Sequence, residues 1–215
     1  MTLKILTAAL LLAQAAPAAQ PLPVLRTEPI PGGSIFWVKN TGTQPVTAFL
    51  IELVNYPGSY YSLWQDEAAA VLIAPGAEKR IQVTNMTVGA VPDYVKLQAA
   101  LFADGSSAGI PEKVTQMVER RRFTLATIRE LIARIEKAKA SSTAPADLIA
   151  ALKQWAESLL PARRADPTAQ TTINNAAARG AISEAAAFLE SHSPEETLAH
   201  LRANEKSLAA GKPAL

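Results

Sequence analysis

An abrupt change of hydrophobic pattern near the middle of the chain constrains the fold more than any other sequence feature. Residues 95–103 (VKLQAALFA) have the apolar content of a buried strand, and the Asp-Gly-Ser of residues 104–106 is typical of a turn. From Pro111 to about Lys139, apolar residues recur instead at the spacing of a helix. The chain is therefore predicted to be β-rich before this point and helical after it.

The β-rich part, residues 20–109, contains six or seven short strand-like runs at regular spacing. Tyr94 comes directly before the last of the long runs, where immunoglobulin-like sandwiches carry their tyrosine corner. We therefore expect an α+β protein whose N-terminal part is an antiparallel immunoglobulin-like β-sandwich. The clearest runs are residues 34–39, 46–54, 71–73, 80–84 and 95–103, preceded by a proline-rich edge strand near residues 24–27.

The run at residues 46–54 (VTAFLIELV) is apolar on both of its faces. Side chains alternate along a strand, so Ala48 and Leu50 share one face, whereas Phe49, Ile51 and Leu53 share the other. A strand that is apolar on both faces is normally covered on both. One cover is expected to be the partner sheet, and the other either the helical half of the chain or a second subunit. Polar turn residues before this run predict that it forms a hairpin with the preceding one.

The helical region, residues 110–215, is expected to begin with a long helix over residues 111–139, followed by about three shorter helices. Such a helix is about 40 Å long, so its distal part should pack on the later helices in a helical hairpin array or small bundle. Helix starts are indicated by Pro111 and Pro145 at first helical positions, by Asp166 as an N-cap, and by Ser193 with Glu196 as a capping box.

The first nineteen residues are predicted to be a cleaved signal peptide. Lys4 supplies a positive start, residues 5–12 are apolar, and residues 16–18 offer the small side chains that a signal peptidase requires, with residues 13–15 as an alternative. No later segment has the roughly 20 apolar residues of a membrane span, so no transmembrane segment is expected in the mature chain. We expect an exported protein, periplasmic or secreted. Because the chain has no cysteine, its stability must come from burial.

The charged and histidine residues give little support to catalysis or nucleic-acid binding. The formal net charge is only +2, and the longest basic run is Arg120-Arg121-Arg122, which fits either a solvated helix face or a set of partners for acidic neighbours. His192 and His200 are the only histidines, too few for a zinc site, and no glycine-rich phosphate loop occurs. We expect no catalytic residue, no metal, no cofactor and no nucleic-acid partner.

Four aromatic residues crowd the segment 55–65 around a Pro-Gly turn: Tyr56, Tyr60, Tyr61 and Trp64. Aromatic side chains with a polar tip bury a large area while keeping one hydrogen bond, which suits binding surfaces as well as internal contacts. Two interpretations follow. The rings pack between the β-rich and helical halves, or they form a binding site.

The segment 102–109 (FADGSSAG), together with Asn40-Thr41-Gly42 and residues 74–76 (APG), resembles a group of uncharacterised exported bacterial proteins. In that group an immunoglobulin-like module is followed by a helix that begins directly after an F-x-D-G-S/T-x-x-G turn. The resemblance covers roughly residues 34–135. Those proteins carry Asp before the proline that opens the helix, whereas this chain has Ile110. The resemblance implies the fold, but no activity and no functional residue.

These observations predict a non-catalytic module of the cell envelope, either structural or binding another protein. The partner would be an envelope protein or polymer, and self-association into a homo-oligomer is left open. The alternative is a carbohydrate- or envelope-polymer-binding module in which Tyr60, Tyr61 and Trp64 form a stacking platform. A third interpretation is a hydrolase that gathers His192 or His200 with a carboxylate and a hydroxyl.

Overall fold

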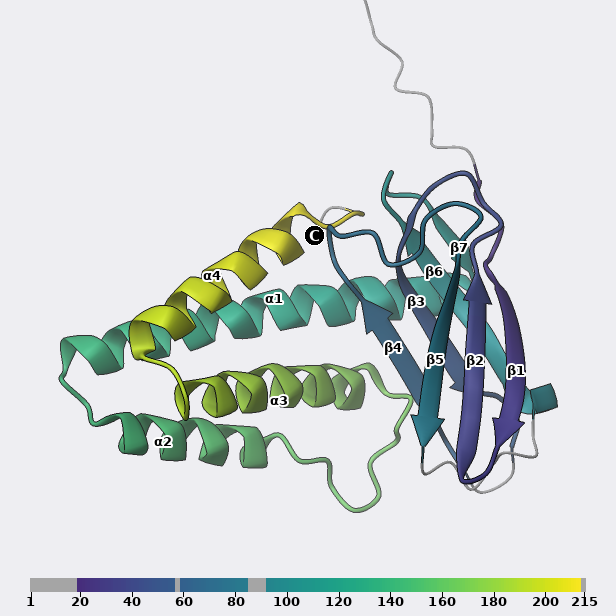
Figure 1. Ribbon diagram of the computed structural model, residues 1–215. Helices are drawn as coiled ribbons and strands as arrows, with labels where there is room; N and C mark the ends of the chain where they lie inside the picture. Colours follow the sequence, from purple (N-terminus) through teal and green to yellow (C-terminus); the bar gives the residue numbers. More distant parts are fainter. Residues whose placement is uncertain (1–18, 57–58, 85–91, 214–215) are drawn as a thin grey trace, which may run out of the picture.

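A computed structural model describes residues 19–56, 59–84 and 92–213 of the chain (Figure 1). Within these residues, two antiparallel sheets are followed by four α-helices, so the α+β class is confirmed. The strands are β1 (Val24–Ile30), β2 (Gly33–Lys39), β3 (Val46–Leu53), β4 (Ser62–Asp66), β5 (Glu78–Thr84), β6 (Val95–Phe102) and β7 (Ser107–Gly109). The helices are α1 (Pro111–Ala140), α2 (Pro145–Ser158), α3 (Gln170–Leu189) and α4 (Pro194–Ala210), and a short 3-10 helix, η1 (Pro92–Tyr94), precedes β6.

The signal peptide predicted for residues 1–19 lies, apart from its last residue, outside the described residues, so it stays a prediction. Among the helices that the structure describes, none is long and apolar enough to cross a membrane. The strands all lie before residue 110 and the α-helices all lie after it, which matches the boundary expected from the sequence. Whether each half is a domain that folds alone stays a prediction.

The strand order shows that the predicted hairpin between residues 34–39 and 46–54 is wrong. One sheet has the order β1-β2-β5 and the other has the order β4-β3-β6-β7, so the two strands lie in different sheets. The connection between them crosses from one sheet to the other and is held by the buried side chain of Asn40. Its amide donates to the carbonyl oxygens of Gln44 (2.8 Å) and Ile73 (3.2 Å), while its side-chain oxygen accepts from the Gly42 N–H (2.9 Å).

Three short segments differ from the predicted strands. Residues 71–73 form only an isolated bridge, between Val46 and Ile73, instead of a strand. Conversely, β4 begins within the segment 55–65, where no strand was expected, and β7 follows the turn at residues 104–106. Both added strands are short and lie at opposite edges of the four-stranded sheet. Their residues are partly exposed and mixed in type, so apolar and polar residues do not alternate clearly enough to predict a strand.

The two faces of β3 are covered as the alternation of its residues predicts. Phe49, Ile51 and Leu53 lie in the core between the two sheets, with Phe36 and Val38 of β2. On the opposite face, Ala48 and Leu50 pack with Met117 of α1. All eight residues of β3 are therefore buried, and the second cover is the helical half of the same chain.

Helix α1 belongs to two cores at once. Its first turns cover the four-stranded sheet, and its distal half extends beyond the sheet, with α4 on one side and α3 followed by α2 on the other (Figure 1). There Leu131 and Ile135 are completely buried against the other helices, and the helical core also contains Leu152, Ile182 and Leu201. Three ion pairs also join α1 to α4: Arg129–Glu205, Glu136–Arg202 and Lys139–Glu195.

The helix starts are mostly those predicted, with one correction. Ser193 and Glu196 form the expected capping box, because the Ser193 hydroxyl accepts from the Glu196 N–H (3.2 Å) and the Glu196 carboxylate accepts from the Ser193 N–H (2.8 Å). Asp166, by contrast, is not an N-cap. Its carboxylate accepts from the backbone N–H (2.8 Å) and the hydroxyl (2.7 Å) of Thr168, which stabilises a turn, and α3 begins only at Gln170.

The passage from β7 to α1 requires a glycine at position 109. Gly109 has φ +107°, and a Cβ there would lie 2.2 Å from the carbonyl oxygen of Gln98. We expect Gly109→Ala to lower the free energy of unfolding by at least about 2 kcal/mol, because both the backbone angle and the pairing with β6 are violated. Urea denaturation measures this effect.

Gly180→Ala is the matched control, because a Cβ at Gly180 in α3 meets nothing within 4 Å. This substitution should leave stability unchanged or raise it by up to about 1 kcal/mol, as expected when alanine replaces glycine inside a helix. Equal effects of the two substitutions would contradict the proposed role of Gly109.

Candidate functional site at the sheet-helix interface

Side chains of residues 60–66 alternate between two environments, and this alternation creates the interface with α1. Tyr61 and Leu63 pack on the core between the two sheets. Trp64 packs on the opposite face, in the cluster that contains Met117 of α1. Tyr60, Ser62 and Asp66 lie at even positions with Trp64, so one row of side chains faces the first turns of α1.

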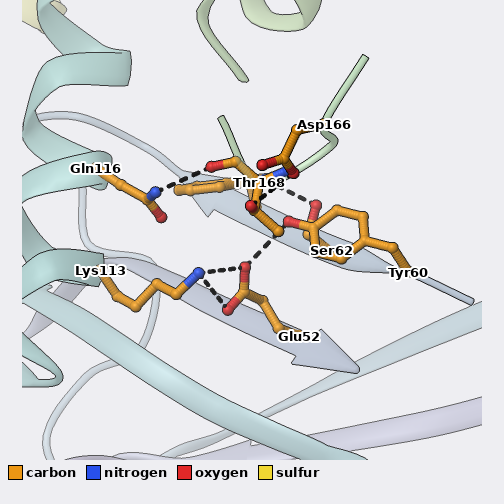
Figure 2. Close-up of polar contacts among 8 residues, drawn as sticks. Glu52, Tyr60, Ser62, Lys113, Gln116, Asp166 and Thr168 are labelled. Atoms are coloured by element: carbon orange, nitrogen blue, oxygen red, sulfur yellow. Dashed lines mark hydrogen bonds and ion pairs between the residues drawn. The ribbon is translucent and has the colours of Figure 1, made fainter. Parts of the chain in front are cut away.

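At one end of this interface, a buried ion pair joins β3 to α1. Lys113 Nζ lies 2.9 Å from Glu52 Oε1 and 2.8 Å from Glu52 Oε2, and the two side chains are only 20% and 5% exposed. The Tyr60 hydroxyl donates to Glu52 Oε1 at 3.0 Å (Figure 2). Both oxygens of this carboxylate therefore have a partner, as a buried charge requires.

The environment of Tyr60 holds its phenol in the neutral form. Burial raises the pKa of Tyr60 to about 12, and the hydrogen bond to Glu52 and the charge of Glu52 act in the same direction, against an opposing hydrogen bond with Ser62. At neutral pH the Tyr60 hydroxyl is therefore a hydrogen-bond donor to Glu52. It is not a base.

The loop between α2 and α3 closes over the same region. Gln116 of α1 donates from Nε2 to the carbonyl oxygen of Thr168 (3.2 Å), and Gln170 Nε2 donates to the Gln116 carbonyl oxygen (3.4 Å). Figure 2 shows the Asp166–Thr168 turn beside Tyr60 and Ser62. The side-chain oxygen of Gln116 is the one buried side-chain polar atom without a hydrogen-bond partner in the described part of the chain.

At the other end of the interface, Arg121 of α1 forms a second buried ion pair. Its Nε lies 3.0 Å from Asp66 Oδ2 and its Nη2 lies 2.7 Å from Asp66 Oδ1, so the pair is bidentate. The Arg121 side chain is 0% exposed and that of Asp66 is 13% exposed. Arg121 Nη1 also donates to the carbonyl oxygen of Lys212 at 2.8 Å, which fixes the segment after α4 against the sheet.

The basic run at residues 120–122 thus combines both environments proposed from the sequence. Arg121 pairs with an acidic neighbour in the interior, whereas Arg122 pairs with Glu119 on the solvated surface of α1. Arg120 takes neither position. Its guanidinium carbon lies over the Trp64 ring, 5.4 Å from the ring centroid.

The four aromatic residues predicted to pack between the halves or to bind a ligand are divided between two faces. Tyr60 and Trp64 lie between the sheet and the helical half, as the packing interpretation expects. Tyr56 and Tyr61 instead pack on the core between the sheets. Tyr56 also contacts Tyr94 edge-on, with 5.5 Å between the ring centroids. Tyr60, Tyr61 and Trp64 therefore do not share one face. Ligand binding by these residues stays a prediction.

The outer face of the three-stranded sheet carries an aromatic residue that sequence reasoning did not single out. Trp37 in β2 has Arg26 of β1 and Arg80 of β5 as its direct neighbours on the adjacent strands. Their guanidinium carbons lie 4.9 Å and 5.8 Å from the Trp37 ring centroid, and the Trp37 indole donates to Glu28 at 3.2 Å. The alternation of side chains along a strand could have identified it. Phe36 and Val38 point into the core, so Trp37 between them must point outward.

His192 lies at the turn between α3 and α4, and His200 lies within α4. Both rings stack on Phe188, with centroid distances of 3.8 Å for His192 and 4.8 Å for His200. His200 Nε2 lies 3.0 Å from the Asn204 amide nitrogen and 3.9 Å from a Glu184 carboxylate oxygen. Among the described residues, no group of three or more His, Cys, Asp or Glu side chains could hold a metal ion.

Comparison of the chain with protein-family models, with curated proteins and with solved structures gives no match.

The Arg121–Asp66 pair should be the most sensitive polar contact of the interface. Replacing Arg121 by Met leaves the Asp66 carboxylate buried without its partner, which costs about 3–5 kcal/mol in comparable sites. We expect a loss of that size in the free energy of unfolding of Arg121→Met, measured by urea denaturation at neutral pH. The neighbouring Arg122→Met is the control, because its exposed pair with Glu119 is worth at most about 1 kcal/mol. Similar losses in the two variants would contradict this assignment.

The raised pKa of Tyr60 predicts a loss of stability in alkali. Because the folded value of about 12 exceeds the ordinary value of 10.0, the contribution of Tyr60 is present below pH 10 and is lost as the pH rises toward 12. Between these limits, the free energy of unfolding should fall more steeply with pH in the wild type than in Tyr60→Phe. Denaturation midpoints measured across that range check this. Tyr94→Phe, at an exposed tyrosine, should keep the wild-type slope. Identical slopes for the wild type and Tyr60→Phe would refute the expectation.

Proposed function

We propose that this chain is a non-catalytic, exported module of the cell envelope that binds another envelope component. The observation that carries the proposal is the row Arg26–Trp37–Arg80 on the outer face of the three-stranded sheet. The helices cover the four-stranded sheet instead, so this row lies on the side of the sandwich opposite to the helical half (Figure 1). Export rests on the predicted leader at residues 1–19.

The chemistry of this row suits a contact surface. Tryptophan and arginine are the residues most enriched among those that dominate binding energy at protein interfaces. The guanidinium contacts and the Glu28 hydrogen bond hold the Trp37 ring in one orientation, which lowers the entropy lost on binding. A flat sheet face with a central tryptophan fits an extended protein or polymer surface better than a small molecule.

The charged groups of the sheet-helix interface support a structural role for that region. Glu52 is bound by Lys113 and Tyr60, and Asp66 is bound by Arg121, so these groups already satisfy one another. Their arrangement joins the β-rich half to the helices. Contacts with a partner are therefore assigned to the outer sheet face and to the exposed helix surfaces.

The β-rich half is further proposed to be an immunoglobulin-like sandwich. Its support is the pair of antiparallel sheets around one core, and the position of Tyr94 directly before β6.

A capture experiment tests the proposed function. The wild-type chain, Trp37→Ala and Trp155→Ala are immobilised in equal amounts and exposed to solubilised envelope extract. Trp155 is the control, because it also carries an arginine over its ring, Arg134 at 4.3 Å, but belongs to the helical half. We expect a specific component that Trp37→Ala retains at least about tenfold less well than the other two proteins. Retention of nothing specific, or equal loss in both variants, would refute the assignment of this face.

The carbohydrate alternative is decided by comparing the wild type with Trp37→Ala and Trp64→Phe. Oligosaccharides of the cell envelope are titrated against the wild type while tryptophan fluorescence is followed. A response that Trp64→Phe abolishes and Trp37→Ala preserves would replace the proposed function with polymer binding at the aromatic segment.

A further inference from the structure

A cavity of about 420 Å³ lies where α3 and α4 diverge over the middle of α1, and residues 66–68, at the end of β4, line its sandwich end. Small residues of α3 form part of its wall, among them Ala177, Gly180 and Ala181. Asn204 and Ser207 of α4 contribute polar groups. The volume falls within the range of pockets that hold small molecules.

Arg120 lines this cavity and is the unusual member of its wall. Among the described residues, no hydrogen bond or ion pair to its guanidinium is found, and its guanidinium carbon lies over the Trp64 ring. The Asp66 carboxylate, whose charge acts on Arg120, is already bound at both oxygens by Arg121. A half-buried guanidinium therefore keeps its hydrogen-bond donors free beside an open space.

The burial of Arg120 has a measurable electrostatic consequence. Burial lowers the pKa of the Arg120 guanidinium, and the charge of Asp66 offsets this only in part. The charged form is thus held in an environment that disfavours it, and an anion entering the cavity would relieve that cost. Charge-assisted pairing with a carboxylate is the strongest hydrogen-bonding arrangement available to such a group.

The remaining charges of the cavity restrict which anion fits. Glu67 and Glu184 also line it, and their side chains have no arginine or lysine partner within the described residues. With one free cation and two carboxylates, the cavity carries a net negative charge, so it repels polyanions such as phosphate or sulfated polymers more strongly than a single carboxylate, whose charge Arg120 alone can neutralise. A single carboxylate on a neutral body is compatible, because it needs one cation and can place its body over the small residues of α3.

We propose that this cavity binds a small organic monocarboxylate, with its carboxylate paired to Arg120 and its neutral body over Ala177 and Gly180. This site lies on the opposite side of the four-stranded sheet from the row at Trp37 and does not depend on the proposed function. Trp64 reports on it directly, because Arg120 must turn part of its guanidinium from the ring toward the ligand.

The test is a titration followed by proton–nitrogen correlation spectra of the three tryptophan indoles, with Trp64 identified through Trp64→Phe. The probes are benzoate and butyrate, with benzamide as the neutral isostere of benzoate and inorganic phosphate as the polyanion. We expect benzoate or butyrate to shift the Trp64 signal saturably at millimolar concentration, and to leave Trp37 and Trp155 unmoved. Benzamide and phosphate should bind at least about tenfold more weakly.

Two variants locate the site. Arg120→Gln should weaken carboxylate binding at least about tenfold, whereas Arg122→Gln, its exposed neighbour, should bind as the wild type does. Gly180→Leu should abolish binding, because the larger side chain fills the cavity while Arg120 is unchanged. This second variant keeps the test valid if Arg120→Gln loses stability. Denaturation curves confirm that each variant is folded. The proposal is overturned if no carboxylate moves Trp64, if Arg120→Gln binds as tightly as the wild type, or if benzamide or phosphate competes equally.

Discussion

The bidentate contact between Arg121 and Asp66 is the interaction on which the rest of the structure depends. It joins the end of an edge strand, the middle of the long helix and the segment after the last helix at one point. A buried ion pair of this kind adds little net stability compared with apolar packing, but its geometry admits few alternatives. Its contribution is to fix the register of α1 along the sheet. The apolar contacts between Leu50 and Met117 then follow from that register.

The periodicity of the sequence accounts for the parts of the fold that are decided locally. The two faces of β3, the turn after Phe102 and the start of α1 at Pro111 were all predictable, because each depends on residues within a few positions of one another. The failed hairpin shows the limit of this reasoning. The polar turn before β3 looks the same whether the chain returns to its own sheet or crosses to the other one. The buried Asn40 decides between them through Ile73, 33 residues away.

The candidate site was only partly visible in the sequence for the same reason. The aromatic segment was correctly singled out as unusual, and the alternation of Tyr60 and Trp64 with Tyr61 explains why it serves two faces. Nothing local to Arg121 indicates that its partner is Asp66, 55 positions earlier in the chain. The three arginines of residues 120–122 are adjacent and identical in type, and only the turn of the helix separates them. It places Arg120 over an aromatic ring, Arg121 in the interior and Arg122 in solvent.

A ribosome makes the chain from its N-terminus, so the contact between Arg121 and the Lys212 carbonyl can form only late in synthesis. Both sheets can be complete while the apolar outer face of the four-stranded one, with Ala48 and Leu101, still lacks its cover, and it stays bare until α1 has emerged. Even then Arg121 has an unfilled donor, since the Lys212 carbonyl that it binds is synthesised only after α4. The segment after α4 thus closes a contact that was prepared 91 residues earlier in the chain. A nascent chain interrupted before Lys212 would keep a buried cation with one of its donors unpaired.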